Sequence, residues 1–272
     1  MLTTDAASLE YDKLGPEVTR AFAENGVVCL RGLLDEKTLA ALREGVEVAI
    51  NEAHAERSGP AATYIKATRL WTRHEGFRDF AFGSRIAEAA AVVMGSRVVR
   101  MYNDSMFVKE PSAPEPTPWH QDLPYFLIDG LNLCSAWIPL DPANEASGAM
   151  SYGLGSHRWG KLYRPEAFED PGTYRSGESY DGPAPDLDAD PERYPTVAFA
   201  TKPGDVVFHH LRTLHKAGPN STEGTRRRVH TVRFAGDDTT WINRPFSTVE
   251  FKTRLDDGDA LAGEDFPVLW PR

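Results

Sequence analysis

The pattern of residue types along the chain changes near residue 97, and this change constrains the fold more than any other feature. From Arg97 onward, short runs of β-branched and aromatic residues alternate with turns rich in Pro, Gly, Asp and Asn. This alternation is typical of β-sandwiches and barrels. The candidate strands are 98–108, 133–140, 150–152, 196–200, 206–210 and 228–234. Helices followed by strands predict a mainly β fold, a sandwich or open barrel with helical buttresses.

The first 96 residues carry signals for helix ends. Proline favours the first turn of a helix, aspartate its N-cap, and glycine the position after its last turn. Apolar residues repeated every three to four positions mark the buried face. The predicted elements are a helix from Pro16 to Gly26, a strand at 27–30, a helix after Asp35 with Leu39, Leu42, Val46 and Ala49 on its apolar face, and a helix from Ser84 to Gly95.

A chain of 272 residues is long enough for one large core, so we expect a single domain over residues 1–272. Its parts are a helical region at about 1–96, a β core at about 97–240 and a C-terminal tail at 241–272. Residues 158–195 are rich in Pro, Asp, Gly and Tyr and are too long for an ordinary connection. We predict a lid-like insertion there, with a merely solvated insertion as the alternative.

Charge and composition exclude several classes of partner. A formal net charge of −10 and a pI near 5.3 argue against nucleic acid and anionic membranes. No apolar run reaches about 18 residues, the length of a transmembrane helix, and the first residues lack an apolar leader. Two cysteines make no disulfide framework. We expect a cytoplasmic monomer or homodimer that acts on a small molecule.

The stretch TPWHQDLPYF, residues 117–126, contains the most informative motif. His120 and Asp122 are two residues apart, and on a strand they would point to the same face. Such a pair arises easily by chance, so it needs a third ligand from elsewhere. His209, His210 and His215 are the candidates. Two histidines and one carboxylate would leave three open positions on an octahedral Fe(II).

Three consecutive arginines, Arg226, Arg227 and Arg228, follow these histidines and lead into a strand. A buried arginine at this place could bind a carboxylate through two parallel hydrogen bonds, which would fix a diacid beside the metal. The alternative is a solvated basic edge that discourages pairing with other strands.

Taken together, these motifs resemble the phytanoyl-CoA dioxygenase family of Fe(II)- and 2-oxoglutarate-dependent oxygenases. The matching stretches are FAENGVVCLRGLLDE, NDSMFVKEPSAPEPTPWHQDLPYF, SAWIPLDPANEASGAMSYGLGSHRWG and KPGDVVFHHLRTLHKAGPNSTEGTRRRVHTVRFAGDD. The resemblance implies a double-stranded β-helix, the cupin-like jelly roll, with metal ligands at one open end. It also implies that His120, Asp122 and His215 are the iron ligands, His215 being selected by the K-A-G-P-N turn that follows it.

The resemblance further implies which residues bind 2-oxoglutarate. Trp137 matches a tryptophan beside the cosubstrate, although a core aromatic is the alternative. Asn103 and Gln121 are weaker candidates, and Lys66 or Lys109 could supply a second cation. Many relatives place the binding arginine eleven positions after the distal histidine, which is Arg226. The family's strand pattern Arg-x-small-x-Ser/Thr instead selects Arg227, with Val229 and Thr231 on the same face.

The implied activity consumes 2-oxoglutarate and O2 at Fe(II), releases succinate and CO2, and oxidises an unactivated C–H bond of a metabolite. Hydroxylation is the expected outcome, and desaturation, cyclisation and epimerisation are alternatives that the sequence does not separate. Two readings from other classes are a cupin-like metal-dependent isomerase and a non-catalytic binding protein.

Overall fold

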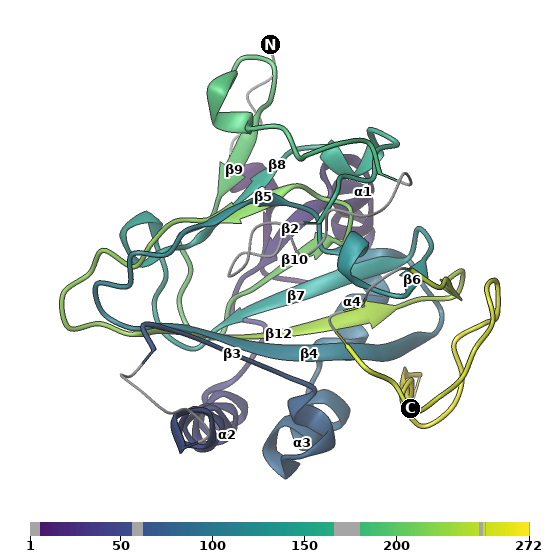
Figure 1. Cartoon of the computed structure of the whole chain (residues 1–272), viewed down its shortest axis with the longest axis horizontal. Coiled ribbons are helices and arrows are strands. Elements are labelled where there is room, and N and C mark those ends of the chain that lie inside the picture. The colour runs from purple at the N-terminus through teal and green to yellow at the C-terminus, as the bar shows by residue number, and fades with distance from the viewer. Residues whose placement is uncertain (1–5, 56–61, 166–179, 245–246, 248, 272) are drawn as a thin grey trace.

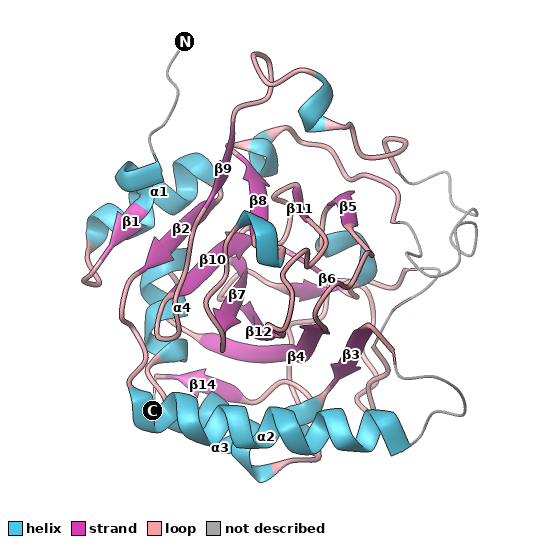
Figure 2. Cartoon of the chain, turned by 90° about the vertical axis from the view of Figure 1, so that its left-hand side faces the viewer, coloured by secondary structure: helices cyan, strands magenta, loops and turns pink. Residues whose placement is uncertain are grey.

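Two β-sheets face each other, and the helices lie on the outer side of the larger sheet (Figures 1 and 2). This computed structural model describes residues 6–55, 62–165, 180–244, 247 and 249–271. The arrangement is the double-stranded β-helix with flanking helices that the sequence predicts, so the fold class is confirmed. None of the helices in these ranges is long and apolar enough to cross a membrane.

The helices follow the end signals in the sequence. Asp35 accepts a hydrogen bond from the backbone N–H of Thr38 at 2.8 Å, which caps the second helix as predicted. Gly26 and Gly95 both end helices in the left-handed conformation, with φ of 75° and 67°. Helix α3 was not predicted, because it is short and rich in aromatic residues that favour helices weakly. The helices are α1 Pro16–Asn25, α2 Glu36–Ala55, α3 Glu75–Gly83 and α4 Ile86–Met94.

The larger sheet has the strand order β1-β2-β10-β7-β12-β4-β14, and β3 also pairs with β4. Strand β14 lies in the predicted C-terminal tail, so that segment completes the sheet beside β4. Strands β1, β3 and β14 have five residues or fewer and are not predicted by the sequence pattern. The strands are β1 Glu10–Tyr11, β2 Val27–Leu30, β3 Tyr64–Thr68, β4 Val99–Lys109, β7 Leu133–Pro139, β10 Val206–His210, β12 Arg227–Ala235 and β14 Val268–Trp270.

The smaller sheet has the order β5-β11-β8-β9 and carries two of the predicted iron ligands. His215 pairs directly with His120 across β11 and β5, which brings their side chains to one place. Its strands are β5 Thr117–His120, β8 Met150–Gly153, β9 Thr196–Ala198 and β11 His215–Ala217, and a separate pair is formed by β6 Ile128–Asp129 and β13 Thr240–Trp241.

The two faces of β12 have different surroundings. Arg227, Thr231 and Arg233 face the space between the sheets. His230 faces the helices, where its Nε2 lies 3.1 Å from Oδ2 of Asp104 and its ring packs against Phe77 and Phe80 of α3. The alternation of side chains along this strand therefore decides which residues belong to the interior of the β-helix.

Part of the predicted lid covers the smaller sheet. Leu187 is buried against Trp119 and Leu214, and Asp188 accepts a hydrogen bond from Nε1 of Trp119 at 3.1 Å and pairs with Lys216. Residues 166–179 lie outside the described part of the chain. The lid function therefore remains a prediction.

Candidate functional site

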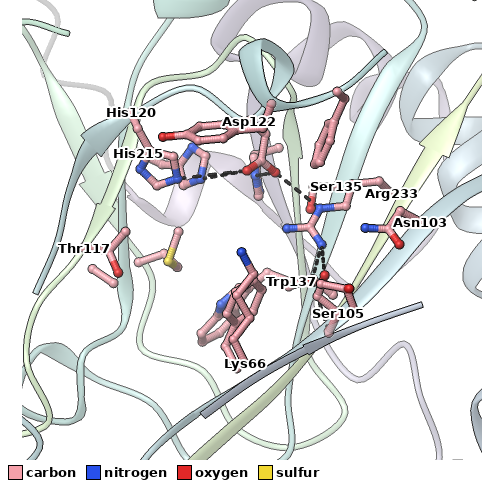
Figure 3. Close-up of a pocket in the computed structure, with 18 of the residues that line it drawn as sticks. Lys66, Asn103, Ser105, Thr117, His120, Asp122, Ser135, Trp137, His215 and Arg233 are labelled. Atoms are coloured by element: carbon pink, nitrogen blue, oxygen red, sulfur yellow. Dashed lines mark hydrogen bonds and ion pairs between the residues drawn. The ribbon is translucent and has the colours of Figure 1, made fainter. Parts of the chain in front are cut away.

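A pocket of about 280 Å³ lies between the two sheets (Figure 3). Strands β3, β4, β7, β10 and β12 supply one wall, and β5, β8 and β11 supply the opposite wall. The pocket contains both apolar surface, from Phe107, Trp137 and Met150, and a group of histidine, aspartate and arginine side chains.

His120, Asp122 and His215 converge at one end of this pocket. Nε2 of His120 lies 4.0 Å from Oδ1 of Asp122, and Nε2 of His215 lies 3.8 Å from the same oxygen. One ligand atom from each residue falls within 4.8 Å of the others, and no other such cluster occurs in the described ranges. The donor set of two imidazoles and one carboxylate suits a non-haem Fe(II) centre with three open positions.

The local backbone differs from the expected one at Asp122. Strand β5 ends at His120, and Asp122 has the right-handed helical values φ −73° and ψ −39° before the 3-10 turn Leu123–Tyr125. The prediction that one strand presents both side chains is therefore wrong. A residue distant in the sequence fixes this turn, since the N–H of Leu123 donates a hydrogen bond to the carbonyl of Leu211 at 2.9 Å.

Backbone carbonyls orient both histidine rings. Nδ1 of His120 lies 2.9 Å from the carbonyl of Pro118, and Nδ1 of His215 lies 2.9 Å from that of Thr213. A proton on Nδ1 leaves the Nε2 lone pair free for a metal. Burial, together with His215, lowers the pKa of His120 to about 3, and burial together with His209 lowers that of His215 to about 4. Both rings are therefore neutral near pH 7, the form that binds metals.

The two other candidate histidines lie on β10 and point in opposite directions. His210 lies outside the pocket, where Nε2 is 3.0 Å from the carbonyl of Leu131 and Nδ1 accepts from the N–H of Arg212. His209 lines the pocket, and its Nε2 lies 3.6 Å from Oδ2 of Asp122. It therefore contacts the carboxylate oxygen that faces away from the other two histidines.

The three adjacent arginines have different environments. Arg227 is 3% exposed and lines the pocket, and no hydrogen bond or ion pair joins its guanidinium to a described residue. Arg226 instead pairs with Glu110 and Glu47, and Arg228 pairs with Asp141 and Glu47, all outside the pocket. Burial lowers the pKa of Arg227 to about 10, and the charges of Tyr64 and Asp141 offset this only in part.

The family model for phytanoyl-CoA dioxygenase (PhyH) matches residues 22–229, which is more than half of the chain and includes His120, Asp122 and His215. The chain belongs to the phytanoyl-CoA dioxygenase family. This confirms the family that the sequence motifs indicate.

Three relatives illustrate the range of the phytanoyl-CoA dioxygenase family. The chain is 27% identical to 1-deoxypentalenic acid 11-beta-hydroxylase from Streptomyces exfoliatus, over 74% of this chain and 73% of the relative. It is 34% identical to a probable alpha-ketoglutarate-dependent hypophosphite dioxygenase from Stutzerimonas stutzeri, over 52% of this chain but only 46% of the relative. The crystal structure of the non-heme alpha-ketoglutarate-dependent carbocyclase SnoK from nogalamycin biosynthesis superposes with a TM-score of 0.74 at 28% identity, covering 98% of this chain and 99% of that one. At the level of the family, these names confirm the predicted class of enzyme and its cosubstrate.

The remaining candidate residues divide into two groups. Trp137 and Asn103 line the pocket. Gln121 is buried elsewhere, donating to the carbonyls of Lys161 and Arg212. Lys109 is also outside the pocket lining, because its ammonium donates to the carbonyls of Glu115 and Gly218 at 2.7 and 2.5 Å.

Two pocket residues next to Asp122, Arg233 and His209, do not stand out in the sequence as groups that contact this carboxylate. Arg233 shares the face of Arg227 on β12, and Nε of Arg233 lies 3.5 Å from Oδ2 of Asp122. His209 was considered only as a metal ligand. Continuing the alternation from Arg227 through Thr231 would have placed Arg233 in the pocket. Although burial would raise the pKa of Asp122, Arg233 and His209 hold it well below its usual value.

Proposed function

We propose that this protein binds Fe(II) through His120, Asp122 and His215, binds 2-oxoglutarate through Arg227, and uses O2 to oxidise a C–H bond of a small molecule. The observation that carries this proposal is the presence of two complementary sites in one pocket. One end holds a two-histidine, one-carboxylate cluster, and the wall of the same pocket holds a buried arginine that forms no ion pair with any residue the structure describes.

Unpaired polar atoms in the pocket support the presence of ligands there. Buried polar atoms are almost always hydrogen-bonded in folded proteins. Four buried atoms that line this pocket have no hydrogen-bond partner in the described structure: Oδ1 of Asn103, Oγ of Ser135, Nε of Arg227 and Nδ1 of His209. A metal ion, a diacid and a polar substrate group would satisfy atoms of these kinds.

Each residue then has a defined task. The triad holds the metal, which supplies the redox chemistry with O2 and the 2-oxo acid when it is bound. Arg227 binds the distal carboxylate of 2-oxoglutarate through its planar fork and so orients the cosubstrate toward the triad. The side chains of Phe107 and Trp137 exclude water around the cosubstrate, which limits side reactions.

Hydroxylation is the proposed outcome. The names of the relatives include a hydroxylase and a carbocyclase, so the same site chemistry serves more than one outcome in this family. Asp122 retains the carboxylate ligand, which supports oxygen transfer rather than halogenation. A cytoplasmic location remains a prediction, resting on Cys29 and Cys134, which are buried and unpaired.

The test is an anaerobic titration of the metal-free protein with Fe(II) and 2-oxoglutarate, followed by a screen of metabolites for substrate-stimulated succinate release. We expect a visible charge-transfer band that needs both additions. Metal binding without 2-oxoglutarate binding would favour the cupin-like isomerase instead. Failure to bind either would favour a non-catalytic protein.

Lys109 gives the proposed cosubstrate site a pH dependence. Burial and the neighbouring Arg227 lower the pKa of Lys109 to about 8. Lys109 pairs with Arg227 across β4 and β12, so a dianion bound to Arg227 should offset the repulsion between the two cations and raise the pKa of the lysine. Affinity for 2-oxoglutarate should therefore be highest below pH 8 and fall as the pH rises through about 8, with proton uptake on binding at pH 8.5.

Isothermal titration in buffers of different ionisation enthalpy measures this proton uptake. Lys109→Met is the control, and it should remove both the uptake and the fall in affinity. An affinity that stays constant between pH 7 and 9.5 in the unmodified protein would contradict the assignment.

A further inference from the structure

A row of four polar side chains crosses the larger sheet beneath Asp122. Arg233 on β12 pairs with Asn103 on β4 and with Ser135 on β7, and Ser135 pairs with His209 on β10. All four residues are at most 5% exposed and line the pocket. A buried row of this kind on the inner face of a sheet is costly unless its members have partners.

Two members of this row contact the same oxygen of Asp122. Oδ2 lies 3.6 Å from Nε2 of His209 and 3.5 Å from Nε of Arg233. Oδ1, by contrast, faces Nε2 of His120 and of His215. The carboxylate therefore has one oxygen directed at the metal cluster and the other directed at the row.

Other contacts fix the orientation of Arg233. Its Nη1 donates to Oγ of Ser105 and Oγ1 of Thr231, both at 2.8 Å, and its guanidinium lies over the rings of Phe107 and Phe126. Figure 3 shows the guanidinium between Asp122 and the hydroxyl groups of the sheet. The arginine is thus held rigidly by the sheet on the side away from Asp122.

A carboxylate can bind a metal through one oxygen or through both. Three open positions remain on an octahedral ion only if Asp122 uses a single oxygen. We infer that His209 and Arg233 are positioning residues that hold Oδ2 of Asp122 and so restrict this carboxylate to one metal bond through Oδ1. This inference rests on the proposed metal site.

The position of His209 distinguishes this role from that of a fourth ligand. Its Nε2 approaches Oδ2, the oxygen remote from the two ligand histidines, and His209 is absent from the cluster that could hold an ion. Groups that orient metal ligands typically change metal affinity by 10–100-fold when they are removed.

The test uses Co(II) alone, titrated into metal-free protein and followed by its visible absorption. The unmodified protein should bind, and His120→Ala should not; failure of this first comparison would refute the proposed metal site. If the unmodified protein binds Co(II), His209→Leu and Arg233→Met should each weaken the affinity for Co(II) by about 10–100-fold. They should also change the Co(II) absorption bands, because a second carboxylate oxygen would take one of the three open positions in place of water.

Two sets of variants separate positioning from general destabilisation. His210→Leu changes the neighbour of His209 on β10, whose side chain lies outside the pocket, and should bind Co(II) with unchanged affinity. His209→Gln and Arg233→Lys retain a donor and should recover part of the affinity. Affinities within about three-fold of the unmodified protein for both His209→Leu and Arg233→Met would overturn the inference. So would a loss in His209→Leu as complete as in His120→Ala, which would make His209 a ligand.

Discussion

Alanine at His120, Asp122 or His215 should abolish 2-oxoglutarate turnover while leaving the protein folded. Each substitution would remove one of the three proposed protein bonds to the metal, and members of a catalytic unit lose activity together when any one of them is removed. We expect a loss of at least about a thousand-fold in each variant. Succinate release measures the turnover, and circular dichroism with thermal unfolding verifies the fold.

His210→Ala is the matched control for His215→Ala. Both histidines are buried and both make hydrogen bonds with backbone groups, but His210 points out of the pocket. The folded His210→Ala protein should retain activity. Full activity in His215→Ala combined with loss in His210→Ala would reassign the third ligand.

The sequence predicts elements whose signals are local. The cap at Asp35, the glycines after α1 and α4, and the runs that form β7, β10 and β12 all lie within a few residues of the structure they specify. Strands β5 and β11 have four and three residues, too few for a visible alternation. The site depends on these two strands, so its geometry could be inferred only through the family resemblance.

The position of Asp122 shows a second limit. The motif identifies the residue, but the turn that aims its carboxylate depends on Leu211, which is distant in the sequence. Lys109 shows the same limit, because the two carbonyls that accept hydrogen bonds from its ammonium belong to separate loops. Contacts between remote segments leave no periodic signal in the sequence, and these contacts place Asp122 in the pocket and Lys109 outside its lining.

Arg227→Ala should produce the second large effect, a loss of affinity for 2-oxoglutarate. The usual spacing of eleven residues after His215 selects Arg226, whereas the alternation of side chains along the strand selects Arg227. Of the three adjacent arginines, all of which the structure describes, only Arg227 lines the pocket. Removing one partner of a buried charge pair typically costs about 2–5 kcal/mol, so affinity should fall by roughly thirty-fold or more. The anaerobic titration in the presence of Fe(II) measures this affinity directly.

Arg226→Ala and Arg228→Ala are neighbouring controls with the opposite orientation. Their guanidinium groups pair with Glu47, Glu110 and Asp141 outside the pocket, and these ion pairs lie away from the proposed cosubstrate site. Each should change affinity for 2-oxoglutarate by less than about three-fold. Arg227→Ala should still bind Co(II), because the triad remains intact. If Arg226→Ala shows the large loss instead, the binding arginine must be the one eleven positions after His215, and β12 must shift its register by one residue when 2-oxoglutarate binds.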